Sequence, residues 1–142
     1  MWGIGQKMWE KGIRQVTKIE KYVTKSGNCP INDFLDELAR DNSNIDALSK
    51  IDLYIRLLGK FGYKLSTMYH GYVKNLSNGL YELRPGNNRV IYFYYGEDQT
   101  YVLLHGFTKK RNKTPRGELE KAKREMLDYI ERKNKNGKRG KI

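Results

Sequence analysis

The sequence predicts a small α+β domain in which helices pack on one face of an antiparallel sheet. Three features predict it: helical periodicity in two adjacent segments before residue 61, short alternating strands between residues 72 and 107, and another helical stripe after residue 114. Brief turns between successive strands favour an antiparallel meander over parallel crossovers. At 142 residues the chain has the length of one domain.

The N-terminal half is predicted to contain one strand and two helices. Residues 16–24 alternate apolar and polar side chains, which is typical of a half-buried strand. Pro30 suits the first helical position, and the apolar spacing that follows predicts a helix to about Asp41. A second stripe, within residues 45–60, predicts another helix. Residues 1–15 have no clean period and are expected to form a poorly ordered extension.

The C-terminal half is predicted to contain the meander and a last helix. Thr114 and Pro115 form a helix-start signal, with Thr114 as the N-cap, and the apolar stripe after them continues to about Arg132. Residues 133–142 are polar and basic, so a disordered tail is expected, which leaves residues 16–132 as the folded domain. The four meander strands are predicted at residues 72–76, 80–84, 89–95 and 100–107.

Alternation along the strands predicts which side chains share a face of the sheet. If Leu83 faces the core, Arg84 faces away from it. Arg89 lies across a four-residue turn from Arg84, so the two guanidinium groups are expected to be near each other. Strict alternation on the last strand places four side chains on one face: Tyr101, Leu103, His105 and Phe107.

The net charge of +12, from 28 Lys and Arg against 16 Asp and Glu, favours a polyanionic partner such as nucleic acid. Six of these cations lie in the last eleven residues, and the rest of the chain still carries +6. An acidic protein partner would satisfy the same charge. The single Cys29, the lack of a membrane-length apolar run and the lack of a signal segment predict a soluble cytoplasmic protein. Two His and one Cys do not form a zinc-ligand pattern, and no phosphate loop or dinucleotide fingerprint occurs, so no metal or cofactor is expected.

Residue types that hold and cleave an RNA phosphodiester gather between Gly79 and Arg116. Cleavage without a metal needs cations around the phosphate, a group that accepts the 2′-OH proton and a group that protonates the 5′-oxygen. Arginine binds phosphate oxygens through paired N–H donors, and histidine titrates near neutrality. Taken alone, each candidate is more often structural, since Glu82 is a ready salt-bridge partner for an arginine. Together they predict one cluster at one end of the sheet: Arg84, Arg89, His105 and Lys110.

Four segments resemble, in order and spacing, one branch of a toxin superfamily. They are SGNCPINDFLDEL, GLYELRP, RVIYFYY and VLLHGFTKKRNKTPRGELEKA. From about Lys18 to Arg132 the chain is similar to the HigB-like, often phage-derived branch of the RelE superfamily. The resemblance implies a RelE-like α+β fold, with two N-terminal helices, a C-terminal helix and a twisted antiparallel sheet. It also implies a type II toxin that cleaves mRNA on the translating ribosome and is silenced by an antitoxin with a helix-turn-helix domain.

The resemblance also implies roles for individual residues. Arg84 and Arg89 are expected to hold the scissile phosphate, while His105 or Lys110 transfers protons. Further contacts with RNA are expected from Lys74, Tyr92, Phe107, Lys109 and Lys113, the aromatic residues by stacking on bases or shaping the pocket.

Two other functions stay open: a non-catalytic basic RNA- or DNA-binding module of phage origin, and an interaction protein that binds an acidic antitoxin-like partner.

Overall fold

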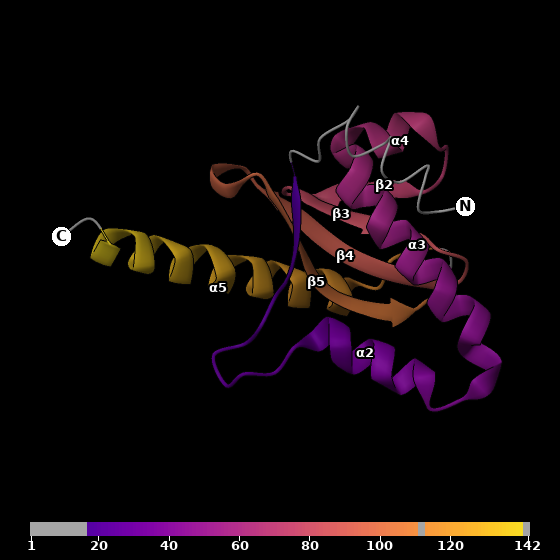
Figure 1. The fold of residues 1–142 in the computed structure, drawn as a ribbon. Coiled ribbons are helices and arrows are strands. Elements are labelled where there is room, and N and C mark those ends of the chain that lie inside the picture. Colours follow the sequence, from indigo (N-terminus) through magenta and orange to yellow (C-terminus); the bar gives the residue numbers. More distant parts are fainter. Residues whose placement is uncertain (1–16, 111–112, 141–142) are drawn as a thin grey trace, which may run out of the picture.

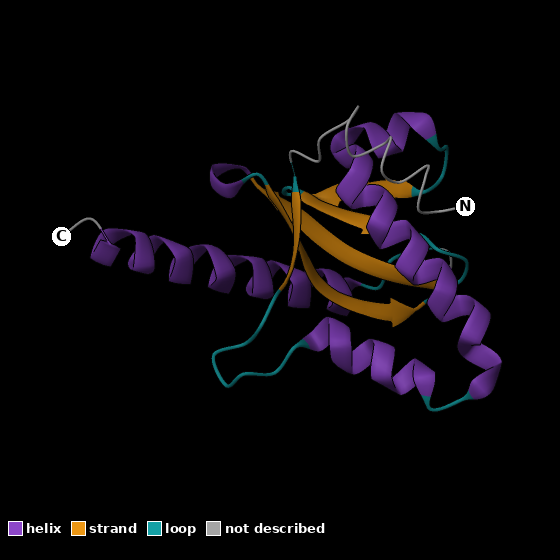
Figure 2. Ribbon diagram, in the orientation of Figure 1, coloured by secondary structure: helices purple, strands orange, loops and turns teal. Residues whose placement is uncertain are grey.

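The computed structural model describes residues 17–110 and 113–140 and shows a five-stranded sheet with helices on both faces (Figures 1 and 2). The strands predicted for the meander are present to within one residue at each end, and the predicted extension of residues 1–15 lies outside the described residues. The helices are α2 (Pro30–Ala39), α3 (Ile45–Phe61), α4 (Leu65–Met68) and α5 (Arg116–Gly140), with short 3-10 turns η1 (Asn42–Asn44), η2 (Gly62–Lys64) and η3 (Gly96–Asp98). The strands are β1 (Lys18–Lys21), β2 (Val73–Ser77), β3 (Leu80–Leu83), β4 (Asn88–Tyr95) and β5 (Thr100–Thr108).

The sheet has the strand order β1-β5-β4-β3-β2. Strands β2 to β5 form the predicted antiparallel meander, which confirms the α+β fold class. Strand β1 joins the edge of β5 in parallel, through hydrogen bonds such as that from the Lys18 N–H to the Gln99 carbonyl at 3.0 Å. This strand is shorter than predicted and ends at Lys21, although the N–H of Tyr22 still donates to the Leu103 carbonyl at 2.9 Å.

The prediction that all helices lie on one face of the sheet is wrong. One core packs α2, α3 and α4 against the sheet, and a second core packs α5 against the opposite face (Figure 1). Successive residues of β4 alternate between them, with Val90 and Tyr92 in the first core and Ile91 and Phe93 in the second. Strands buried on both faces are continuously apolar, and β4 has the sequence NRVIYFYY.

A β-bulge in β5 changes the face on which its last residues lie. His105 is paired with Ile91, but the next pair is Leu103 with Tyr92, so Leu104 is the extra residue. Strict alternation fails at this point, and the expected grouping of His105 with Tyr101 and Leu103 is wrong. Leu103 belongs to the α3-side core, whereas His105 contacts α5 on the other face.

Gly106, just after the bulge, has no room for a side chain. An added Cβ would lie 2.4 Å from Cδ2 of Phe34 on α2 and 3.1 Å from the carbonyl oxygen of Arg89. We expect Gly106→Ala to destabilise the protein by about 1–3 kcal/mol, because overpacking must displace a ring held in a core. Urea unfolding measures the change. Gly117→Ala is the matched control: it has open space in α5, and a gain of roughly 0.5–1 kcal/mol is expected. Equal effects of the two substitutions would contradict the packing argument.

Helix α5 begins at Arg116, close to the predicted start, but with a different cap. The carbonyl of Pro115 accepts hydrogen bonds from the N–H groups of Glu118 and Leu119, so Pro115 takes the N-cap position. Thr114, predicted as the N-cap, instead donates its hydroxyl hydrogen to Glu82 of β3 at 2.8 Å. The start of α5 is therefore attached to the sheet by a side-chain bond.

The C-terminal end of α5 lies further along the chain than the sequence predicts. The helix continues past Arg132 to Gly140, where a disordered tail was expected, and it extends beyond the edge of the sheet (Figure 1). Within this extension Lys135 pairs with Glu131 at 3.3 Å, one helical turn away, and Lys133 reaches Asp98 of η3 at 3.7 Å. These contacts each add a little to the stability of the helix just after Arg132.

Asp128 attaches the middle of α5 to the segment after β1. It accepts hydrogen bonds from the Tyr22 hydroxyl at 2.6 Å and from Arg132 at 2.8 Å, and Lys25 lies 4.0 Å away. The hydrogen bond from Tyr22, followed by the hydrogen bond and charge of Arg132, lowers the pKa of Asp128. Burial and the bond to Asp128 raise the pKa of Tyr22 to about 12.

This lowered pKa predicts acid sensitivity. A carboxyl whose pKa is depressed on folding contributes stability at neutral pH, which is lost as the pH falls from about 5 through the folded-state pKa. Asp128→Asn should be less stable than wild type by about 1 kcal/mol at pH 7. The difference should shrink on acidification, as measured by thermal unfolding from pH 7 to pH 3. A constant difference would show that the Asp128 charge is not responsible.

Candidate functional site

Polar side chains gather on the α5 face of the sheet, at the end where β3 and β5 stop and β4 begins. The strand register places four residues in one row across the sheet: Lys74, Glu82, Ile91 and His105. A second row, one step toward that end, contains Arg84, just beyond β3, and Arg89 paired with Phe107. We call these two rows the polar end of the sheet. The rest of this face is the apolar core beneath α5.

Glu82 is the centre of a buried ionic network. Its side chain is 1% exposed, and its Oε1 lies 3.7 Å from Nε of Arg84 and 3.6 Å from Nε of Arg89. Its Oε2 accepts the Thr114 hydroxyl. The two arginines are therefore close together, as their separation by one turn predicts, and one internal carboxylate contacts both of them.

The two arginines differ in access. The Arg89 side chain is 6% exposed, and its Nη1 donates to the carbonyls of Gly86 and Asn88, both at 2.8 Å. Burial, followed by the charge of Arg84, lowers the pKa of Arg89, and the charge of Glu82 opposes this shift. The Arg84 side chain is 30% exposed, although its Nε is buried and makes no hydrogen bond within the described residues. Arg84 can therefore meet an anion from solution, whereas Arg89 mainly holds the turn and Glu82.

His105 lies beneath α5 and is 2% exposed. Its Nδ1 lies 2.5 Å from Oε1 of Glu125, and its Nε2 lies 3.4 Å from Oε1 of Glu118. The Phe107 ring, half-buried, is 6.3 Å from the imidazole between ring centroids. The bulge at Leu104 produces this arrangement, because in a regular strand of the same length the imidazole would face α3.

Four lysines form a rim around the two arginines of the polar end. Lys74 is exposed on β2, beside Glu82. Lys109 is half-buried, and its N–H donates to the carbonyl of Asn87 at 2.8 Å, which holds the chain leaving β5 against the turn before β4. Lys110 and Lys113 are exposed in the connection to α5.

Tyr92 is the one predicted site residue that the structure does not bring to this end. It lies on the opposite face and is 3% exposed, with its ring stacked on Tyr81 at 5.7 Å and edge-on to Tyr101 at 5.8 Å. Burial, followed by these neighbours, raises the pKa of Tyr92. Its position is that of a core residue.

Sequence reasoning did not identify Glu118 and Glu125 as site residues. They lie seven residues apart on the inner face of α5, and Glu125 is 7% exposed between Ala122 and Tyr129 of the apolar stripe. A carboxylate inside an apolar helical stripe is a signal that could have indicated a buried partner. Among residues 17–110 and 113–140, no cluster of His, Cys, Asp and Glu side chains is suited to holding a metal ion.

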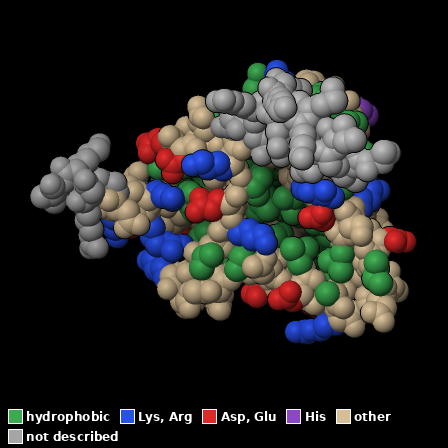
Figure 3. Space-filling view, in the orientation of Figure 1, with side chains coloured by type: hydrophobic (Ala, Val, Ile, Leu, Met, Phe, Trp, Pro, Cys, Tyr) green, Lys and Arg blue, Asp and Glu red, His purple; other side chains and the backbone are tan. Residues whose placement is uncertain are grey.

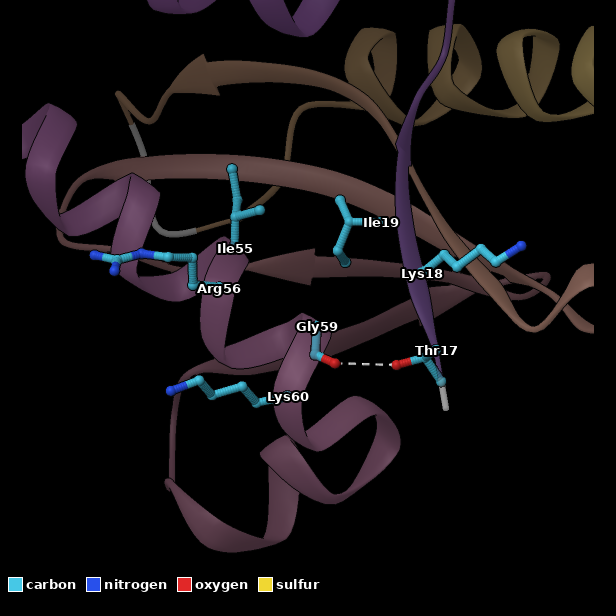
Figure 4. Close-up of a pocket in the computed structure, with 7 residues that line it drawn as sticks. All are labelled: Thr17, Lys18, Ile19, Ile55, Arg56, Gly59 and Lys60. Carbon is cyan, nitrogen blue, oxygen red and sulfur yellow. Dashed lines mark hydrogen bonds between the residues drawn. The ribbon is translucent and has the colours of Figure 1, made fainter. Parts of the chain in front are cut away.

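A separate cavity of about 500 Å³ lies on the α3 side, between β1 and α3 (Figure 4). Ile19 and Ile55 point toward each other across it, and the Thr17 hydroxyl donates to the Gly59 carbonyl at its end. Hydrophobic side chains are visible at this place in the space-filling view, while Lys and Arg side chains gather along α5 (Figure 3). The cavity and the polar end lie on different faces of the sheet. In the described part of the chain, no helix combines the length and apolarity needed to cross a bilayer.

The fold and the polar end define a class: an α+β protein whose mixed sheet carries a basic, carboxylate-backed site beneath its last helix. The family model described as "Phage derived protein Gp49-like (DUF891)" matches residues 33–127. The chain belongs to this phage-derived Gp49-like family, a family of RelE/HigB-like toxins, which confirms the resemblance seen in the sequence. It is a toxin of the toxin–antitoxin kind.

A solved structure was also found to be similar. It is the crystal structure of the archaeal RelE-RelB complex from Pyrococcus horikoshii OT3, with 19% sequence identity and a TM-score of 0.46. The match covers 67% of this chain and 97% of that chain. No curated protein matches the sequence.

Proposed function

We propose that this toxin is a metal-independent endoribonuclease that cleaves mRNA on the translating ribosome and is silenced by an antitoxin with a helix-turn-helix domain. The observation that carries the proposal is the convergence of Lys74, Arg84, Arg89, His105 and Phe107 at one end of one face of the sheet. Family membership supports a toxin, and the similar archaeal protein was solved as a RelE-RelB complex. The net charge of +12 favours RNA and ribosomes as partners.

In the proposed reaction, the 2′-oxygen of the RNA attacks the neighbouring phosphorus and the bond to the 5′-oxygen breaks. Arg84 and Lys74 hold the phosphate oxygens, and Arg89 keeps Glu82 and the turn in place behind them. Lys109, Lys110 and Lys113 draw the RNA backbone to the rim, and Phe107 offers its half-buried ring to a base. His105 or Lys110 transfers the protons. Tyr92 has no part in this proposal, because it is buried on the other face.

One observation favours the alternative of a non-catalytic basic RNA-binding module. Arg89 and His105 are both buried, and both are engaged by carboxylates of the protein. A cationic rim of Lys74, Lys110 and Lys113 could bind a polyanion without catalysing a reaction. The two functions differ in their product, since only an enzyme leaves new RNA ends.

The test is controlled expression of the wild-type protein, followed by mapping of mRNA 5′ ends. An endoribonuclease toxin should stop growth and create new 5′ ends within translated messages. If the protein is harmless and mRNA stays intact during translation, the enzyme proposal fails. A binding module would still show RNA affinity that falls steeply with salt.

A further inference from the structure

A buried histidine held between two carboxylates lies behind the cationic rim. His105 faces Glu125 through Nδ1 at 2.5 Å and Glu118 through Nε2 at 3.4 Å. Both carboxylates come from α5, and the other charged groups in the same row of the sheet are Glu82 and Lys74. The proposed function leaves both α5 carboxylates without a role.

Hydrogen-bond chemistry leaves two acceptors facing each other in this group. A carboxylate accepts hydrogen bonds, so Nδ1–H of His105 donates to Glu125 and fixes the tautomer. Nε2 of the neutral ring is then an acceptor, and it faces a second acceptor, the carboxylate of Glu118. Nε2 is buried and has no hydrogen-bond partner among the described residues. One additional proton, on either Nε2 or Glu118, turns this contact between two acceptors into an attraction.

Glu118 is the most exposed of the three side chains. The Glu118 side chain is 27% exposed, whereas those of His105 and Glu125 are 2% and 8% exposed. Glu118 lies one helical turn after Thr114, whose hydroxyl is bonded to Glu82 between the two arginines. Glu118 therefore lies near the polar end of the sheet, on its α5 face.

We propose that Glu118 is the catalytic base of the RNA cleavage, with His105 as the group that shares the proton and Glu125 as a positioning residue behind it. This inference depends on the proposed endoribonuclease function. The 2′-OH gives its proton to the Glu118 carboxylate as its oxygen bonds to phosphorus, and the proton is then shared with Nε2 of His105. The resulting imidazolium is stabilised by Glu125. The bond from phosphorus to the 5′-oxygen breaks, and the Lys110 ammonium protonates that oxygen, which leaves a 2′,3′-cyclic phosphate and a 5′-OH end.

The test compares Glu118→Gln with wild type on a defined mRNA in a reconstituted translation reaction. Glu118→Gln keeps the size of the side chain and cannot take the proton. We expect its cleavage rate to fall by about 10²-fold or more, and the rise of the wild-type rate with pH to disappear. Glu118→Asp should recover part of the rate. Glu120→Gln, on the same helix and paired with the half-buried Lys123, is the matched control and should stay within about twofold of wild type.

The outcomes separate this inference from the proposed function. If wild type makes no new RNA ends, the endoribonuclease function fails, and Glu118 loses its proposed role with it. If wild type cleaves and Glu118→Gln keeps its rate and pH profile, only the assignment of Glu118 is wrong. If Glu118→Gln is slower by the same factor at every pH and also melts at a lower temperature, Glu118 is a structural contact of α5. Loss of the pH-dependent rise at an unchanged melting temperature supports the catalytic assignment.

Discussion

Replacing Lys74 and Arg84 together with alanine is expected to abolish growth arrest and to lower the rate of mRNA cleavage by at least about 10²-fold. These are the cations of the polar end that solvent reaches most directly, because Lys74 is exposed and the Arg84 side chain is 30% exposed. The protein should stay folded, since Glu82 keeps its contacts with Arg89 and Thr114. Growth curves, 5′-end mapping and a melting curve of the purified variant measure the three effects.

The matched control for this variant removes the same charge elsewhere. Lys121 and Arg124 are exposed on α5, and their replacement by alanine also lowers the net charge by two. If binding of the polyanion depends only on total charge, both double variants should lose activity equally. We expect the Lys121 and Arg124 variant to keep most of its activity. Equal loss would mean that the polar end is not the site of cleavage.

The second large effect expected is on stability, from Arg89→Ala. The substitution leaves the Glu82 carboxylate, 1% exposed, with one partner fewer, and removes two bonds to the carbonyls of Gly86 and Asn88. Breaking a buried ion pair from one side costs about 3–5 kcal/mol, because the remaining charge is left in a poorly solvated place. Thermal unfolding should show a midpoint lower by roughly 10–20 °C.

An exposed ion pair provides the comparison for Arg89. Lys123 pairs with Glu120 on the surface of α5 at 3.6 Å, and the two side chains are 33% and 48% exposed. Lys123→Ala should change the free energy of unfolding by less than about 1 kcal/mol. If Arg89→Ala unfolds at the wild-type midpoint, Arg89 is not the structural residue inferred here. Its role as a direct phosphate ligand would then become the better explanation.

The sequence predicted the strands of the meander well because each is short, apolar and bounded by Gly, Asn or Pro. It predicted the nearness of Arg84 and Arg89 for a similar reason, since a four-residue turn leaves two ends little freedom. It did not predict which face α5 would cover. Both faces of β4 are apolar, so its sequence predicts burial on both sides. Residues such as Phe93 and Tyr92 do not show which helix packs on which face.

The site was less predictable than the fold, because its geometry depends on contacts between distant elements. Thr114 has the residue type of an N-cap, and only the tertiary structure shows that its hydroxyl bonds to Glu82. Tyr92 and Phe107 are similar as aromatic strand residues, yet they lie on opposite faces. Glu118 became a candidate only when the structure placed it beside His105.

The extra residue at Leu104 puts Leu103 and His105 on opposite faces of the sheet, although regular alternation would put them on the same face. Removing the Leu104 codon would make Leu103 and His105 neighbours in a regular strand, and His105 would still pair with Ile91 and face α5. The codons on either side would still encode good strand residues. Relatives of this chain with one residue fewer here would thus keep the buried histidine group and lose the extra side chain that Leu104 adds to the core beneath α5. Such length differences in β5 are a feature to compare among them.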